Sequence, residues 1–317
     1  MPTDMHILVV GPGALGCLVA TTISRGTEGT ASRLSVLDHD RNRADLLNRQ
    51  GICYELDGDR RRFPIAVTAD PLSVGATDVV ILCVKSYDIP ASLAYCQPLL
   101  VEGTVLLFLQ NGIAHLDCGD ATGEAAIAYG TTTEGATLIN PGHIRHAGHG
   151  ATFFGFPSRA DAHSATLLAQ TAAICSRGGL TTTITDAILH RLWAKLFVNV
   201  GINALTAIHG CTNGDLLTLP GVVDRMRTVV TEAEHVARAR GIIVSGDPFA
   251  ATVEVCKKTA GNISSMLQDV RRRRRTEIDA INGAVVREGR ALGLETPENL
   301  RLAEQIRAIE AGYAATC

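Results

Sequence analysis

Short apolar runs alternate with longer segments of helical periodicity through the first half of the chain. The runs over residues 6–11, 33–38, 78–86 and 104–112 are bounded by glycine or polar residues, which is typical of buried parallel strands. Residues 14–25 and 88–99 have the pattern of helices, the second with Pro90 in its first turn. This alternation predicts βαβ crossovers and a doubly wound parallel sheet.

A further strand and a hairpin are expected before the pattern changes. Residues 125–133 read as a strand, and residues 135–156 as a hairpin that turns at Asn140, Pro141 and Gly142. From Asp186 onward only helical periodicity remains, broken at several prolines and glycines. We therefore expect an α/β chain with two domains: a Rossmann-type domain over residues 1–184 and an all-helical domain over residues 185–317.

Length and composition fit this division and exclude several classes of protein. A chain of 317 residues is long enough for two domains, and its formal charge of −3 argues against a polyanionic partner. No run of 18 apolar residues is present, and the start of the chain lacks the pattern of a secretion signal. The nine cysteines include no C-x-x-C pair, as in reduced proteins. We expect a cytoplasmic protein with no nucleic-acid or membrane partner.

A glycine-rich turn follows the first expected strand. The motif "GPGALG" places Gly11, Gly13 and Gly16 in the pattern G-x-G-x-x-G, directly before the first expected helix. Gly11 permits a tight turn, Gly13 lets a pyrophosphate approach the backbone, and Gly16 allows the helix to pack closely on the strand. The helix begins at Ala14 and Leu15, whose region supplies amide donors for a phosphate. The motif predicts a dinucleotide site.

The end of the second expected strand leaves the type of dinucleotide open. Asp38 stands about twenty residues beyond the glycines, where an acid normally accepts the ribose hydroxyls of NAD. Arg41 and Arg43 follow, and either could grip the 2′-phosphate of NADP or lie in a solvated first helical turn.

The expected helix around "WAKLFVNVGINALTAIHG" has a polar stripe on an otherwise apolar surface. Lys195, Asn199 and Asn203 recur at steps of four, so they point in one direction. Buried polar groups are costly when unpaired, so this stripe should face something polar. Either solvent or a ligand cleft would satisfy that requirement.

A second dense motif extends from Ala260 to Val286. Asn262, Ser264 and Ser265 stand at an expected helix start, where they could be caps, and Glu277 lies in a segment that is apolar at helical spacing. Arginines occupy all of positions 271–275, but no aromatic residues are interleaved with them. We interpret this run as a solvated helix face and not as a nucleic-acid site.

Three histidines recur near the hairpin. His143, His146 and His149 are spaced by three, which alternates faces in a strand, and we expect no cysteine or carboxylate to join them. We expect no metal site.

The chain resembles the ketopantoate reductase (2-dehydropantoate 2-reductase) family along nearly its whole length. The matching segments are "GPGALG", "CVKSYD", "LQNG", "GTTTEGA", "LWAKLFVNVGINALTAIHGCTNGDL", "NISSMLQD" and "TEIDAINGAVVREGRALGLETPENLRL". The resemblance implies a Rossmann domain followed by a helical domain, with the substrate held in the cleft between them.

The resemblance also implies roles for particular residues. Lys195 would be the catalytic lysine and Glu277 its acidic partner. Lys85 and Asn111 would lie on the cofactor side. The residues expected to contact the 2-oxo acid are Asn199, Asn203, Asn262 and Ser265. Family members commonly carry an arginine near the end of the second strand, where this chain has Asp38 and His39.

The expected function is reduction of a branched 2-oxo acid, with ketopantoate giving pantoate in pantothenate biosynthesis. NADPH is the favoured cofactor, and NADH is the alternative because of Asp38. Two other functions remain open: reduction of a different 2-oxo acid by the same family, and dinucleotide binding or sensing without catalysis. The expected oligomeric state is a monomer or a homodimer.

Overall fold

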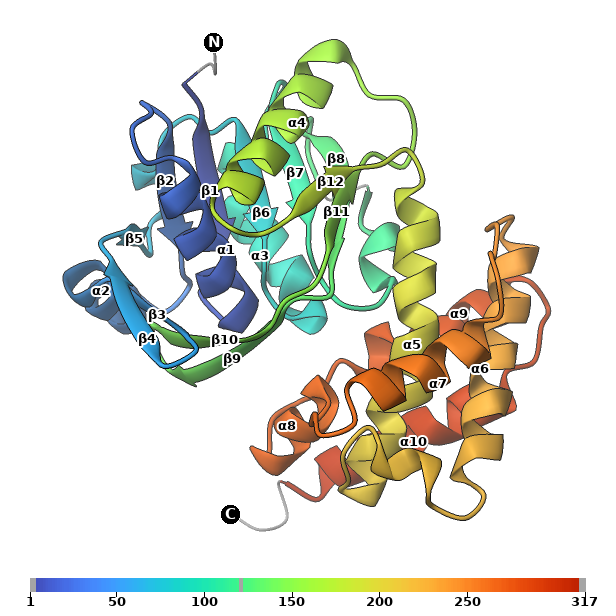
Figure 1. Ribbon diagram of the computed structural model, residues 1–317. Coiled ribbons are helices and arrows are strands. Elements are labelled where there is room, and N and C mark those ends of the chain that lie inside the picture. Colours follow the sequence, from blue (N-terminus) through green and yellow to red (C-terminus); the bar gives the residue numbers. More distant parts are fainter. Residues whose placement is uncertain (1–3, 120–121, 314–317) are drawn as a thin grey trace. The chain divides into compact units, whose positions relative to one another are not determined.

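The computed structural model describes residues 4–119 and 122–313, and the chain forms two compact units (Figure 1). The first unit comprises Met1–Gln110 and Asp117–Ile188. The second comprises Leu189–Cys317 together with the short segment Asn111–Leu116. This segment precedes the last strands of the first unit in the sequence, yet it belongs with the helices.

The first unit is built on an eight-stranded sheet with the order β12-β11-β8-β7-β6-β1-β2-β5. Strands β5, β2, β1, β6, β7 and β8 are parallel, whereas β11 runs antiparallel to β8. Chain order rises outward on both sides of β1, so the sheet has its topological switch point between β1 and β6. The doubly wound sheet expected from the sequence is confirmed. Its strands are β1 (His6–Val10), β2 (Arg33–Leu37), β5 (Ala66–Thr68), β6 (Val79–Leu82), β7 (Val105–Phe108), β8 (Ala126–Thr132), β11 (Thr152–Gly155) and β12 (Thr182–Ile184).

The central strands explain the apolar runs in the sequence. Every residue of β1, β6 and β7 is buried, as expected for strands covered on both faces. The helices of this unit are α1 (Ala14–Gly26), α2 (Arg41–Gln50), α3 (Ile89–Cys96) and α4 (Ala162–Arg177).

A second, four-stranded sheet has the order β4-β3-β10-β9. The expected hairpin is confirmed as β9 (Gly135–Asn140) and β10 (His143–Gly148), with Gly142 at a φ of +74° in the turn. Its expected second arm is too long, because Thr152–Gly155 forms β11 and pairs with β8 in the larger sheet. It pairs with β3 (Ile52–Leu56), which is far away in the sequence, and β3 pairs with β4 (Asp59–Phe63) (Figure 1). Strands β3 and β4 were not predicted from the sequence. Four of the five residues of β4 are polar and exposed, so no apolar pattern marks it.

In the described residues of the second unit, every regular element is a helix. They are α5 (Ile188–His209), α6 (Val222–Ala239), α7 (Pro248–Lys258), α8 (Ser265–Arg271), α9 (Asn282–Ala291) and α10 (Pro297–Ala311). The apolar positions around the polar stripe of α5, such as Trp193, Leu196 and Val200, are buried as expected. Among the described helices, none combines the length and apolar character that crossing a membrane requires.

One expectation for this unit is wrong. The arginine run at positions 271–275 was interpreted as a solvated helix face, but α8 ends at Arg271 and a short 3₁₀ turn, Ile278–Ala280, follows a break. Arg273 takes a φ of +51°, which a helix does not contain. The residues at positions 271–275 are all exposed, but most of them lie in the break and not on a helix face.

Candidate active site

The glycine-rich turn of the first unit leaves an open approach to the start of α1. Gly11 has a φ of +89°, and a Cβ at Gly16 would collide with the Gly11 carbonyl oxygen, so both positions require glycine. Gly13 is exposed, and a Cβ there would meet nothing within 4 Å. No side chain caps α1 and no acid stands in its first turn, so the amides at Ala14 and Leu15 are suited to a pyrophosphate.

Two more predicted cofactor residues lie at the carboxyl edge of the same sheet. Lys85 follows β6, the strand that pairs with β1, and the Gly11 turn begins directly after β1. Asp38 follows β2, the neighbour of β1 on the other side. The glycine turn, Lys85 and Asp38 therefore share one edge of the sheet, whereas Asn111, which was also assigned to the cofactor side, belongs to the second unit.

Asp38 is already engaged by an arginine. Its side chain is buried, and Arg43 donates to its two oxygens from Nε at 2.5 Å and Nη2 at 2.6 Å. The Asp40 amide also donates to Oδ1 of Asp38, at 3.1 Å. Arg41, by contrast, is exposed at the first position of α2. The Asp38 charge is therefore compensated within the protein, and Arg43 is committed to it.

In the second unit, the side-chain amide of Asn111 links Lys195 to Glu277, and all three residues were predicted. Lys195 on α5 donates from Nζ to Oδ1 of Asn111 at 2.8 Å, and Nδ2 of Asn111 donates to Oε2 of Glu277 at 3.1 Å. The Glu277 side chain is buried and Lys195 is half-buried. An amide accepts at one end and donates at the other, so it links a cation to an anion with correct polarity at both ends.

The environment makes Lys195 a readier proton donor. Burial lowers the pKa of Lys195 to about 8, against the opposing attraction of the Glu277 charge. An ammonium with a pKa near neutrality is suited to general acid catalysis. The arrangement therefore offers a positive charge and a proton at one position.

The loop that carries Asn111 is fixed to Glu277's own segment. Gly112 has a φ of +77°, and a Cβ at this position would collide with the carbonyl oxygen of Ala280. The amide of Ile113 donates to that same oxygen at 3.2 Å. The Ala280 amide in turn donates to the Glu277 carbonyl oxygen at 3.0 Å. Close backbone packing therefore sets the position of Asn111 relative to Glu277.

His115 belongs to the same cluster and was not predicted from the sequence. It is fully buried, and burial lowers its pKa to about 4; the Glu277 charge opposes this shift and the Lys195 charge adds to it. A neutral imidazole thus stands near both groups at neutral pH. Its place four residues after Asn111 in "NGIAH" was the only signal in the sequence.

The predicted substrate residues occupy two places in the second unit. Asn199 and Asn203 continue the stripe of Lys195 along α5, the first half-buried and the second 7% exposed. Asn262 and Ser265 are exposed at the start of α8. Ser264, and not Ser265, caps that helix: its Oγ accepts from the Leu267 amide at 3.1 Å.

These two places are linked by a buried hydrogen bond. Oγ1 of Thr206 on α5 donates to Oγ of Ser264 at 2.7 Å. Asn203 lies one turn before Thr206 on α5, and Ser265 is the residue after Ser264. The segments that carry Asn203 and Ser265 are therefore in contact. Ser265 does not cap α8, because Ser264 does.

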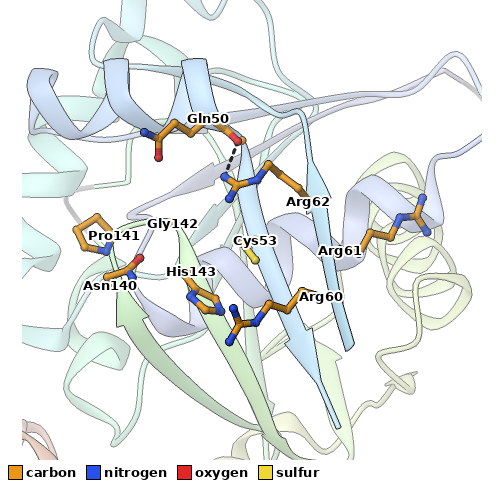
Figure 2. A pocket seen from close by; sticks show the side chains of 10 residues that line it. Gln50, Cys53, Arg60, Arg61, Arg62, Asn140, Pro141, Gly142 and His143 are labelled. Atoms are coloured by element: carbon orange, nitrogen blue, oxygen red, sulfur yellow. Dashed lines mark hydrogen bonds between the residues drawn. The ribbon is translucent and has the colours of Figure 1, made fainter. Parts of the chain in front are cut away.

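A cavity elsewhere in the first unit contains none of these residues. It measures about 420 Å³ and is lined by Arg60, Arg61 and Arg62 of β4 and by the β9–β10 turn (Figure 2). Each arginine already has a protein partner: Glu55, Glu28 and the Gln50 carbonyl oxygen, respectively. None of the predicted site residues lines this cavity, and two of its three arginines are paired with carboxylates.

The histidines near the hairpin differ from expectation in one respect. His143 and His146 lie on opposite faces of β10, and His143 contacts Glu55 at 2.9 Å. The expectation that no carboxylate joins these histidines is wrong, because Oε2 of Glu134 lies 2.6 Å from Nε2 of His146. Glu134 directly precedes β9, and only the pairing of β9 with β10 brings it close to His146, so no pattern in the sequence indicates this contact.

The fold and site together define a class, a Rossmann-type oxidoreductase with a lysine-bearing helical unit. Sequence comparison specifies the family: residues 7–159 match "Ketopantoate reductase PanE/ApbA" and residues 187–310 match its C-terminal part. The chain belongs to the ketopantoate reductase family.

Individual relatives agree with this assignment. A 2-dehydropantoate 2-reductase of Halobacterium salinarum is 35% identical over 306 residues, covering 96% of this chain and 98% of the relative. The crystal structure of a family member from Ralstonia eutropha JMP134 has a TM-score of 0.87 at 30% identity, covering 98% and 100% of the two chains. D-mandelate dehydrogenase in complex with NADH and anilino(oxo)acetate has a TM-score of 0.88 at 25% identity, covering 98% and 99%.

Proposed function

We propose that this protein reduces ketopantoate to pantoate with a reduced nicotinamide dinucleotide, as a step of pantothenate biosynthesis in the cytoplasm. The observation that carries the proposal is the Lys195–Asn111–Glu277 chain of hydrogen bonds, with a lysine pKa of about 8. Family membership supports the same reaction. A protein that only senses a dinucleotide has no use for a positioned proton donor.

Lys195 acts on the oxygen of the ketone. When bound, the reduced nicotinamide supplies a hydride to the carbonyl carbon, and negative charge develops on the carbonyl oxygen. The ammonium of Lys195 stabilises that charge and transfers one proton from Nζ to the oxygen, which gives the 2-hydroxy acid. Glu277 and Asn111 keep Nζ oriented and favour its charged form before transfer.

The remaining polar residues bind the rest of the substrate. We assign contacts with the carboxylate and hydroxyl of the 2-oxo acid to Asn199, Asn203, Asn262 and Ser265. Amides and hydroxyls bind such groups without adding charge that would compete with Lys195. Their exposed or half-buried placement, apart from Asn203, leaves them accessible.

For the cofactor we propose Gly11, Gly13, Ala14, Leu15 and Gly16 around the pyrophosphate, with Lys85 beside them and Asp38 and Arg41 near the adenosine ribose. NADPH is the favoured form. Arg43 compensates the negative charge of Asp38, so Asp38 would repel a 2′-phosphate less than an unpaired carboxylate would. The exposed Arg41 is available to pair with that phosphate.

A second candidate is reduction of another 2-oxo acid with NADH. It is supported by the similarity to D-mandelate dehydrogenase, whose structure contains NADH and a 2-oxo acid analogue. A pocket distinguishes 2-oxo acids that differ by one small group by only about 1–3 kcal/mol, so neighbouring substrates are realistic competitors.

A substrate panel tests both candidates. Purified protein is assayed for oxidation of NADPH and NADH with ketopantoate, with the same acid lacking its hydroxymethyl group, and with phenylglyoxylate. The proposal requires the highest kcat/KM for ketopantoate. Preference for phenylglyoxylate would establish the second candidate, and no turnover of any acid, with dinucleotide still bound, would indicate a binding protein. Gel filtration of the same sample distinguishes the monomer from the homodimer.

A further inference from the structure

We propose that Glu134, His146 and His149 form a binding site for one zinc ion in the sheet-containing unit. Each of these side chains offers one ligand atom, and the three atoms lie within 4.8 Å of one another. Two imidazole nitrogens and one carboxylate oxygen are a donor set that zinc takes in proteins, with water completing the tetrahedron.

Sheet pairing, not sequence spacing, creates this cluster. Glu134 lies in the link between β8 and β9, His146 lies on β10, and His149 follows the end of β10. The β9–β10 register pairs Ala136 with His146 and Gly135 with Gly148, which places the start of β9 beside the end of β10. All three residues belong to one compact unit.

Burial separates the roles of the three ligands. The side chains of His146 and Glu134 are each only 2% exposed, whereas His149 is exposed. The ring of His149 meets that of His146 edge-on, with centroids 4.6 Å apart. Two ligands are thus held inside the protein, and the third covers them from the solvent side, where an ion would enter.

Tyr54 orients the buried histidine from its other nitrogen. The Tyr54 hydroxyl lies 2.7 Å from Nδ1 of His146, while Nε2 of His146 faces Oε2 of Glu134 at 2.6 Å. Metal-bound histidines characteristically have such a partner on the second ring nitrogen, which fixes the ring for coordination. Tyr54 comes from β3, the strand next to β10.

Coordination requires only a small adjustment. Zinc bonds of about 2.0–2.1 Å at tetrahedral angles place neighbouring ligand atoms roughly 3.4 Å apart. The Glu134–His146 pair must therefore open slightly from 2.6 Å, and the exposed His149 must close inward. Nitrogen donors favour zinc over Mg²⁺ or Ca²⁺, which prefer oxygen ligands.

Zinc binding to tag-free, chelator-treated protein tests the site directly. We expect one zinc ion per chain by competition with a chromophoric chelator, and the zinc-loaded protein should have a higher Tm. Glu134→Gln and His149→Ala should each weaken binding at least about tenfold, and Tyr54→Phe by about 10–100-fold. His163→Ala, which removes an exposed histidine on α4, is the matched control and should bind like wild type.

Cobalt provides a second readout that does not depend on stability. Co²⁺ bound by two histidines, one carboxylate and water should give tetrahedral visible absorption in wild type and lose it in His149→Ala. The proposal is overturned if wild-type protein binds no zinc, or if His149→Ala binds zinc as tightly as wild type. It is equally overturned if His163→Ala loses as much affinity as His149→Ala does.

Discussion

Lys195 donates its hydrogen bond to Oδ1 of Asn111 at 2.8 Å, so an uncharged amide holds the charged end of the lysine. The amide fixes the direction of Nζ without taking its proton. Glu277, at 3.1 Å from the other end of the amide, attracts the ammonium and favours its charged form.

Lys195→Ala should lower kcat by roughly 10²–10⁴-fold, because the proton donor is lost at the reacting oxygen. Dinucleotide affinity, measured by titration calorimetry, should stay nearly unchanged because the glycine turn is intact. Lys257→Ala, an exposed lysine of α7, serves as the control. Wild-type turnover by Lys195→Ala would show that another group is the acid.

The pH profile of kcat/KM for the reduction should fall as pH rises through about 8, since Lys195 must be protonated to act. Glu277→Gln removes the charge that raises this pKa, so the falling limb should move to lower pH. The measurement is kcat/KM across pH for both proteins. A limb that stays in place in Glu277→Gln would contradict the assigned partnership.

Two adjacent serines should separate binding from stability. Ser265→Ala should weaken substrate binding, seen as a higher KM, by about 1–3 kcal/mol, and Asn203→Ala should do the same. Ser264→Ala should instead lower the free energy of unfolding by about 1 kcal/mol, because it removes the cap of α8. Thermal melts and substrate titrations on both serine variants distinguish the two roles, and interchanged phenotypes would refute them.

Asp38→Asn should raise kcat/KM for NADPH and leave that for NADH level or lower. Asparagine cannot hold Arg43 by two charge-assisted hydrogen bonds, so this guanidinium becomes available to a 2′-phosphate. Kinetics with both cofactors at fixed ketopantoate give the ratio. A wild type that strongly prefers NADH would reverse the proposed cofactor and make Asp38 its determinant.

Gly112→Ala should lower kcat and Tm together. A Cβ at this position would meet the Ala280 carbonyl oxygen, and the φ of +77° adds strain, so Asn111 must shift away from Lys195. Gly293→Ala is the control: its φ is +69°, but a Cβ there meets nothing within 4 Å. An equal effect of both substitutions on kcat would mean that the close packing at Gly112 is not what positions Asn111.

The sequence predicted the parts of the molecule that depend on local pattern. Apolar runs located the central strands, and steps of four along α5 located Lys195, Asn199 and Asn203. The residues that were not predicted, His115, Tyr54 and Glu134, are brought to their partners by tertiary contacts. His115 and Glu277 are far apart in the chain, as are Tyr54 and His146, and no periodicity connects either pair.

The break after α8 could not be predicted for a related reason. Apolar side chains on either side of it are buried at spacings that suit a helix, so the pattern concealed the interruption. After the break, the Ala280 carbonyl oxygen accepts from the Ile113 amide and lies where a side chain at Gly112 would be. That contact joins segments that are distant in the chain.

The membership of Asn111–Leu116 in the helical unit limits how this chain can be divided or inherited. A gene fragment that encodes only residues 189–317 would produce the six helices without the amide that joins Lys195 to Glu277. The segment 189–317 therefore cannot be exchanged between related proteins by itself. Recombination that exchanged it alone would combine Lys195 from one parent with the Asn111 loop of the other. Functional chimeras of such proteins should require both segments from the same parent.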